Sequence, residues 1–569
     1  MNSRFFAKSS MFGVGVVIAL LIAAACGGEE PAATPTATQP PAVVATPTPT
    51  ATSIPTPTPT TTPKRGGVIK ENVGQDPNIF GPLDHASGGT NTHLARMYSN
   101  LVWNPQGNTL VPDAAESYAV SADGLTWTFK IRNNIKWHPG TPAGPRDGTF
   151  MTAQDVKYSF EKMMGLVDAV TSPRCGWIKE FVDIGRPDNG IEVVDGLTVK
   201  VHMQQGMSSI PSVLATGFCG MIPVGTNRDM LKQRPFGSGP FRLKSFQRGA
   251  LWVYERNPEY FKPGLPYLDE IDLIVMTGTE TVQSAFLTNR LDVSGGWPTS
   301  DNKGKYDEMI AQKKIYLQPY STQCRPQGVF MNATKPPFSD PKLRQAVNLA
   351  IDRKSYITIM HNGYAAAHLL LDTDGFGRTE KEIWERPGYR QPHDADLAEA
   401  KRLMQELYPN GLDVKMPVES SAAYSKQGEF VANELNKIGI RAAIELGDSA
   451  RIDDIFGKLN YALMPYWFCQ ATGVPEELMG SYFLTGGARN WTGYSNKAFD
   501  AAYLDLAATQ DPAQKKLKAR AMEDMVLNDM VVAPLPVHTS ARSAWTYVHD
   551  LPITITQYNW SKAELIWRE

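Results

Sequence analysis

Residues 328–357 read GVFMNATKPPFSDPKLRQAVNLAIDRKSYI and predict a strand, a turn and a helix in that order. The strand is the apolar run at residues 329–331, and the two prolines that follow stop the extended chain. Asp340 is placed to cap the helix, because its carboxylate can accept a backbone N–H of the first turn. Arg353 falls outside the apolar face of this helix. That face consists of Leu343, Val347, Ala350 and Ile351, and the segment is typical of an α/β lobe.

The same segment resembles the signature of the family 5 extracellular solute-binding proteins, the oligopeptide, dipeptide and nickel binders of ABC importers. In that family a strand ending in Asn is followed by a helix with the pattern PF-D-RVRQA-NYAID. The matching residues here are Asn332, Pro337, Phe338, Asp340, Leu343, Arg344, Gln345, Ala346, Asn348, Ala350, Ile351 and Asp352. The resemblance implies a two-lobed α/β fold, the type II periplasmic-binding-protein fold of cluster C, with a small subdomain inserted in the first lobe.

Other passages resemble the same family in the same order along the chain. Residues 112–117 match a segment that is helical in the family, and residues 125–132 alternate apolar and polar side chains as a half-buried strand does. Residues 237–241 resemble a "GTGPY" loop, and residues 286–297 a helix-to-strand passage. The resemblance covers nearly all of residues 65–551.

A chain of 569 residues is too long for a single core, so we expect several domains. The resemblance divides it into a signal peptide (1–25), a Pro/Thr-rich linker (26–64), lobe I (65–110, 235–322 and 538–569), the inserted subdomain (111–234) and lobe II (323–537). Several crossings between the lobes predict a hinge that closes on a ligand.

The N-terminus predicts export. Arg4 and Lys8 precede an apolar run at residues 11–25, which is shorter than the roughly 20 residues of a membrane-spanning helix. The run ends in AAACG, where Cys26 resembles the lipidated cysteine of bacterial lipoproteins, although Ala23 stands where Leu is usual. The resemblance implies a chain anchored outside the cell membrane by lipid; the alternative is an ordinary cleaved signal with an incidental cysteine. The Pro, Thr, Ala and Ser residues that follow cannot form a core and predict a spacer.

The wall of the ligand site is expected at residues 466–475 and 489–494. In peptide-binding relatives an Asp in this region holds the α-ammonium group of the ligand, and here its position falls on Gln470 or Ala471. Loss of a charge-assisted hydrogen bond costs about 1.5–3 kcal/mol. The sequence therefore argues against peptides held by a free amino terminus and favours a neutral or sugar-like group at Gln470. Glu476 or Glu477 is the alternative anchor.

The residues predicted to face the ligand are Trp297, Tyr320, Tyr466, Trp467, Phe468, Gln470, Arg489 and Trp491. The aromatic members offer rings for stacking, and packing in the core is the alternative for each of them.

Four cysteines remain after Cys26, which permits two disulfides with three possible pairings in an exported chain. In some oligopeptide binders a cysteine before the signature strand pairs with one beside the ligand Asp. The resemblance thus implies Cys324–Cys469, which leaves Cys175–Cys219.

The net charge of −2 gives no basic surface for nucleic acid. The nine histidines form no HExxH motif, and no nucleophile motif stands out, so we expect no metal, no cofactor and no enzyme activity. The prediction is a monomeric, extracytoplasmic lipoprotein that captures a small solute for an ABC permease and its ATPase. The alternatives are a sensor or surface protein that feeds no permease, and a hydrolase on this scaffold.

Overall fold

The computed structural model describes residues 62–85, 87–106, 109–140, 142–320, 327–361, 363–371, 375–420, 422–468, 470, 472–487, 489–552 and 562–569. The predictions for Cys26, Cys324, Cys469 and Ala471 lie outside these residues. Residues 62–569 form one compact unit.

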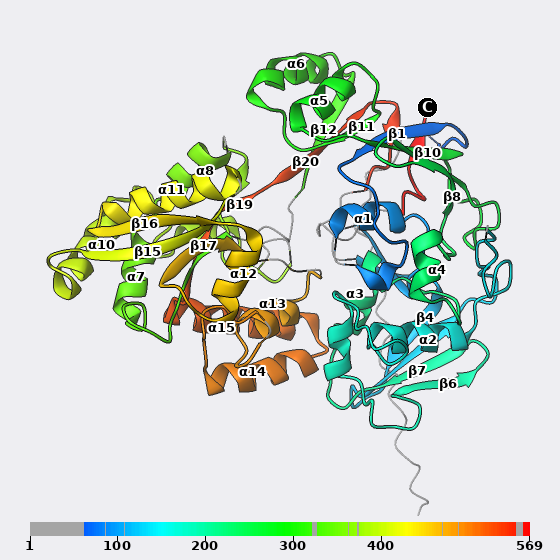
Figure 1. The fold of residues 1–569 in the computed structure, drawn as a ribbon, viewed down its shortest axis with the longest axis horizontal. Helices are drawn as coiled ribbons and strands as arrows, with labels where there is room; N and C mark the ends of the chain where they lie inside the picture. The colour runs from blue at the N-terminus through cyan, green and yellow to red at the C-terminus, as the bar shows by residue number, and fades with distance from the viewer. Residues whose placement is uncertain are drawn as a thin grey trace, which may run out of the picture. The chain divides into compact units, whose positions relative to one another are not determined.

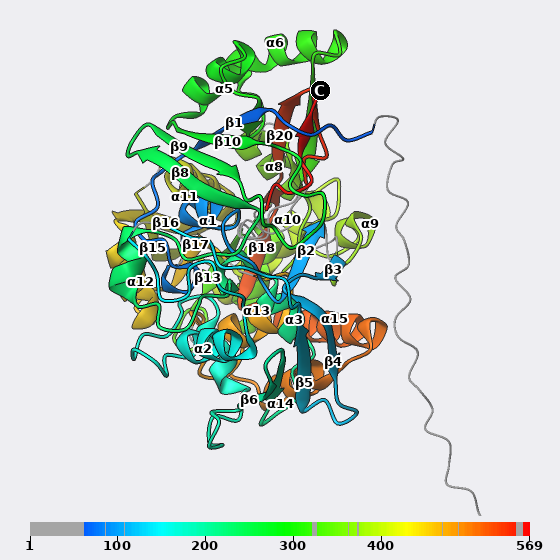
Figure 2. The same ribbon diagram turned by 90° about the vertical axis from the view of Figure 1, so that its right-hand side faces the viewer.

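Lobe I is built on a seven-stranded sheet in the order β12-β20-β11-β1-β10-β9-β8. Strand β1 (Val68–Val73) lies in the middle and runs parallel to both β10 (Glu270–Val275) and β11 (Val293–Gly295). The outer strands pair antiparallel and are β8 (Phe241–Gln247), β9 (Leu251–Arg256), β12 (Ile315–Tyr320) and β20 (Ser540–Trp545). Helices α5 (Thr279–Leu287) and α6 (Ser300–Ala311) pack beside β11 and β12 (Figures 1 and 2).

A second sheet of four antiparallel strands occupies the range expected for the inserted subdomain. Its order is β4-β5-β7-β6, with bounds Ala115–Val120, Thr126–Ile131, Thr198–His202 and Ile191–Asp195. Helix α2 (Ala153–Met163) packs on β6 and β7 with Val156 and Phe160 fully buried. A disulfide joins Cys175 to Cys219, whose Cα atoms lie 6.0 Å apart.

The helix expected at residues 112–117 is wrong, because β3 (Thr109–Pro112) and β4 lie there instead. Tyr118 pairs with Phe129 and Val120 with Trp127, so hydrogen bonding to β5 fixes this segment as an edge strand. A register shift between Ala115 and Ser117 marks a bulge where the strand begins.

Lobe II contains the signature segment. Strand β13 (Gln327–Met331) lies between β17 (Leu463–Trp467) and β18 (Val532–Leu535). Helix α7 (Pro341–Ala350) follows, and Asp340 accepts the N–H of Lys342 at 2.8 Å, so the predicted strand, turn, cap and helix are all present. Strands β15 (Leu412–Glu419) and β16 (Ile440–Gly447) form a separate parallel pair.

The helices of lobe II, in chain order, are α7, α8 (Arg353–His361), α9 (Glu380–Trp384), α10 (Asp394–Leu407), α11 (Ala422–Asn436), α12 (Ser449–Gly457), α13 (Pro475–Tyr482), α14 (Lys497–Ala508) and α15 (Pro512–Asp529). The remaining elements are the helices α1 (Gly88–Leu94), α3 (Ile210–Leu214) and α4 (Arg228–Gln233), and the strands β2 (Val102–Gln106), β14 (Ala365–Ala366), β19 (Val537–His538), β21 (Val548–His549) and β22 (Trp567–Arg568). Three single-turn 3₁₀ helices cover Pro82–Asp84, Gly176–Glu180 and Gly217–Cys219.

Arg353 lies outside the α7 face, as expected, but it is fully buried at the start of α8. Its guanidinium donates to the carbonyls of Pro534 at 2.9 Å and Gly388 at 2.6 Å, and it sits over the ring of Tyr389. These bonds join α8 to β18 and to the segment before α10. The sequence pattern does not show this burial, because the carbonyl partners come from distant segments.

The C-terminal residues dock against lobe I through a buried charge network. Lys562 pairs with Asp113, and Lys262 bridges Asp113 at 2.9 Å and Glu564 at 2.8 Å. Asp113 and Lys562 are both fully buried. Burial raises the pKa of Asp113, but the attraction of Lys262 and Lys562 and their hydrogen bonds outweigh it and lower the pKa to about 2.

Candidate functional site

A pocket of about 220 Å³ opens at the carboxyl ends of β1 and β11 in lobe I. Ligands of α/β proteins bind at this edge of a sheet, where loops follow the parallel strands. The lining residues come from five separate segments: Glu71, Asn72, Val73 and Gly74; Gly89 and Thr92; Val293, Ser294 and Gly295; Tyr320; and Arg542. Of the residues predicted to face the ligand, Tyr320 is therefore the one that lines this pocket.

A carboxylate and a guanidinium line the pocket. Its ionised lining residues are Glu71 and Arg542. Arg96 lies behind the pocket and donates to Glu71 Oε2 at 2.6 Å, with both side chains nearly buried. Arg542 donates to the carbonyl of Pro552 at 3.3 Å, and its guanidinium carries five N–H donors in all. Such a group suits a carboxylate, which it can hold with two parallel hydrogen bonds.

Several predicted ring residues lie in a lobe II aromatic cluster made of Phe330, Phe456, Tyr466, Phe468, Tyr482 and Trp491. Phe468 is fully buried and packs on Phe330 with ring centroids 4.7 Å apart. Trp491 stacks on Phe456 at 4.2 Å and 16° between planes. Core packing, the alternative given above, therefore describes Phe468, while stacking on Phe456 covers one face of the half-buried Trp491.

The other predicted residues of lobe II border this cluster. Tyr466 donates its hydroxyl hydrogen to Glu419 at 3.1 Å, and Arg489 donates to the hydroxyl of Tyr482 at 3.2 Å. Trp467 is half-buried at the end of β17, and Gln470 is 7% exposed. Hydrogen bonds within lobe II already orient Tyr466 and Arg489.

Trp297 lies at a crossing between the lobes. Its indole N–H donates to the carbonyl of Thr539 at 2.7 Å, and its ring stacks on Tyr364 at 4.3 Å. Thr539 lies between β19, which pairs with β14, and β20 of the lobe I sheet. Trp297 therefore joins lobe I to the crossing strand, and one face of its ring is already covered.

The two alternative amine anchors have partners within the protein. Glu476 is fully buried and pairs with Lys515, and Glu477 accepts from the N–H of Thr472 at 2.7 Å and from its hydroxyl at 2.6 Å. The structure therefore does not favour either carboxylate as a substitute for the missing Asp.

Sequence reasoning missed Glu71 and Arg542. Arg542 is the charged residue of β20, whose sequence is SARSAW, and no motif marks it. Only the sheet order, which inserts the last long strand of the chain beside β11, brings it near β1.

The profile of the bacterial extracellular solute-binding proteins, family 5, matches residues 109–490. The glutathione-binding protein GsiB of Escherichia coli (strain K12) is 26% identical over 444 residues, which cover 74% of this chain and 80% of GsiB. DppA of Helicobacter pylori in complex with the peptide STSA superposes with a TM-score of 0.71 at 20% identity, covering 89% of this chain and 99% of DppA. AgaA of A. tumefaciens R10 in complex with agropinic acid gives a TM-score of 0.70 at 21% identity, covering 88% and 99%.

The fold and the pocket thus define a periplasmic-binding-protein type of solute receptor. The chain belongs to family 5 of the bacterial extracellular solute-binding proteins, as its signature segment predicted. It functions as the substrate-binding protein of an ABC importer, and its relatives are binding proteins rather than enzymes. Within the described ranges, no helix combines the length and the apolar character needed to cross a bilayer.

Proposed function

We propose that this protein captures a small organic solute that carries a carboxylate and presents it to an ABC permease. The arginine at the lobe I pocket is the observation that supports this ligand class. Arg542 lines the pocket, and a guanidinium can hold a carboxylate with two parallel hydrogen bonds. A carboxylate placed in the pocket gains a charge-assisted hydrogen bond, which is worth about 1.5–3 kcal/mol.

The relatives agree with a carboxylate at this end of the ligand. GsiB is named a glutathione-binding protein, and the two structures contain a peptide and agropinic acid. Each of these solutes bears at least one carboxylate, although they differ in the rest of the molecule. A shared site for the carboxylate, facing a second wall that differs between relatives, accounts for this range of solutes.

The second wall is proposed at Gln470, with Tyr466, Trp467 and Arg489 beside it. The position of the amine-anchoring Asp of peptide binders falls on Gln470 or Ala471, and Glu476 and Glu477 have other partners. A buried ammonium group without a counter-ion would be strongly unfavourable. The preferred solute therefore presents a neutral polar group to this wall, and free peptides bind weakly. Closure of the lobes follows because a solute that contacts both lobes binds the closed state more tightly.

The proposal also covers the N-terminal segments, the division into lobes and the partners of the protein. We place residues 1–25 as a signal peptide and Cys26 as the lipid anchor, with residues 26–64 as a spacer at the outer face of the cell membrane. The lobes and subdomain divide as the family resemblance implies. The protein acts as a monomer, without catalysis, and a permease and an ATPase complete the importer.

The test is thermal unfolding of the mature protein with glutathione, dipeptides, opine acids and neutral oligosaccharides. A ligand at one hundred times its dissociation constant stabilises the folded state by about 2.7 kcal/mol. We expect a shift with an acidic solute and none with its amide or ester. A rise in melting temperature with neutral sugars alone would refute the proposal that the solute carries a carboxylate. If the folded protein shows no rise with any of the solutes tested, that result would count against the proposal for these solute classes. A permease pair encoded beside the gene separates an importer from a sensor.

A further inference from the structure

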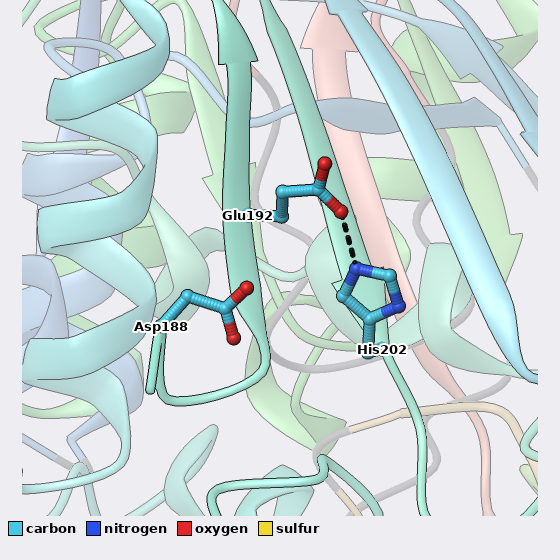
Figure 3. Close-up of side chains that lie close together, drawn as sticks. All are labelled: Asp188, Glu192 and His202. Carbon is cyan, nitrogen blue, oxygen red and sulfur yellow. Dashed lines mark hydrogen bonds and ion pairs between the residues drawn. The ribbon is translucent and has the colours of Figure 1, made fainter. Parts of the chain in front are cut away.

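The outer hairpin of the inserted subdomain brings together a histidine and two carboxylates. Glu192 lies on β6, His202 lies at the end of β7, and Asp188 lies in the turn before β6. His202 Nε2 lies 2.7 Å from Glu192 Oε2, and one ligand atom from each of the three residues lies within 4.8 Å of the others (Figure 3). All three side chains are partly exposed, so solvent reaches the space between them.

The backbone fixes this arrangement. The His202 N–H donates to the carbonyl of Gly190 at 2.8 Å, so His202 stands beside the start of β6, and Glu192 points to the same face two residues later. Asp188 Oδ1 accepts the Gly190 N–H at 3.0 Å, which closes the turn and holds its carboxylate toward the hairpin. Strand pairing thus positions Glu192 and His202, and the hydrogen bond within the turn positions Asp188.

We propose that Asp188, Glu192 and His202 form a binding site for a divalent transition-metal ion, with Zn²⁺ as the best fit. One imidazole nitrogen and two carboxylate oxygens supply three protein ligands, and water can complete a tetrahedral shell at this accessible position. Histidine selects Zn²⁺ and its neighbours over Mg²⁺ and Ca²⁺, which prefer all-oxygen sites. The site lies in the inserted subdomain and shares no residue with the lobe I pocket.

Two cations on the same face compete with the metal. Arg186 holds Asp188 through two hydrogen bonds of 3.1 and 3.2 Å, and Lys200 pairs directly opposite Glu192 across the hairpin. The Arg186 side chain is 37% exposed, so it can turn into solvent when the metal takes the carboxylate. Competition by Arg186 for Asp188 lowers the affinity for the metal ion without removing the site. Substitution of Arg186 therefore tests the proposal.

The experiment measures Zn²⁺ and Co²⁺ binding to the tag-free mature protein by calorimetry and, for Co²⁺, by visible absorption. We expect one equivalent to bind, His202→Gln to abolish binding, and Glu192→Gln and Asp188→Asn each to weaken it at least tenfold. Arg186→Gln should tighten binding, because Asp188 is then released from its ion pair.

His549→Gln is the matched control, since His549 also faces a carboxylate, that of Glu569 at 3.4 Å, but belongs to no cluster of three ligands among the described residues. This variant should bind like the wild type. The proposal is refuted if the folded wild type shows no saturable Zn²⁺ binding, if His202→Gln binds as well as wild type, or if Arg186→Gln weakens the metal. Circular dichroism shows whether each variant has kept its fold.

Discussion

The most informative stability test is Asp113→Asn in the buried network that holds the C-terminal residues. The carboxylate of Asp113 forms ion pairs with Lys562 and, at 2.9 Å, with Lys262. It also accepts the backbone N–H of Asn100 at 3.0 Å. The amide removes the negative charge but keeps the shape of the side chain. Lys562, which is fully buried, is then left without its counter-ion, and Glu564 remains to balance Lys262.

The size of the effect follows in two ways. A pKa lowered from 3.8 to about 2 corresponds to about 2 kcal/mol of stabilisation of the ionised form at neutral pH. Removing one partner of a buried ion pair costs about 3–5 kcal/mol, because the remaining charge is uncompensated. We therefore expect Asp113→Asn to lower the free energy of unfolding by about 2–5 kcal/mol.

The assay is urea unfolding followed by tryptophan fluorescence, with Asp113→Asn/Lys562→Met as a second variant. The double variant should recover part of the loss, since no buried charge is left unpaired. Asp413→Asn is the control, because its partner Arg441 lies on the surface and the pair is exposed. The account is wrong if Asp113→Asn unfolds at the same urea concentration as the wild type, or if the double variant is less stable than the single one.

Three further predictions follow from the same structure. Burial, opposed by a backbone hydrogen bond, lowers the pKa of His85, His93 and His138 from 6.5 to about 4. The unfolded chain therefore binds more protons in this range, and stability should fall as the pH drops from about 6.5 to 4; unchanged stability over that range, measured by urea unfolding at each pH, would contradict this. Arg353→Met should lower the free energy of unfolding by about 2–4 kcal/mol, because the carbonyl of Gly388 loses its side-chain donor and the carbonyl of Pro534 keeps only the Tyr389 hydroxyl at 3.2 Å as a side-chain donor. A loss below about 1 kcal/mol in calorimetry would refute that role. Reduction of the Cys175–Cys219 disulfide, which closes 44 residues, should cost up to about 4 kcal/mol, and equal melting temperatures with and without reductant would show that it contributes nothing.

The local pattern of the sequence predicted what local interactions decide. Asp340 caps α7 because its position before a proline and an apolar helix leaves few alternatives. The helix expected at residues 112–117 failed for the opposite reason, since pairing with β5 overrides the preference of that segment. The burial of Arg353 was equally hidden, because two of its carbonyl acceptors lie 35 and 181 residues away in the chain.

The binding site was only partly predictable. The ligand wall at residues 466–491 stays a prediction from family resemblance, and the resemblance does not show that Phe468 packs its ring in the core or that Trp491 stacks on Phe456. Arg542 has no sequence signal, because its role depends on the insertion of β20 beside β11. The charge of a site assembled from five segments becomes visible only in the fold.

The central claim, a carboxylate bound at Arg542, is tested most directly by calorimetric titration of the acidic solute that gives the largest thermal shift. Arg542→Gln and Arg441→Gln form a matched pair, since Arg441 is an exposed arginine on β16, outside the lobe I pocket. We predict that Arg542→Gln weakens binding at least tenfold, as the loss of one charge-assisted hydrogen bond of about 1.5–3 kcal/mol requires, and that Arg441→Gln leaves it unchanged. Equal affinity of the wild type and Arg542→Gln would contradict the account.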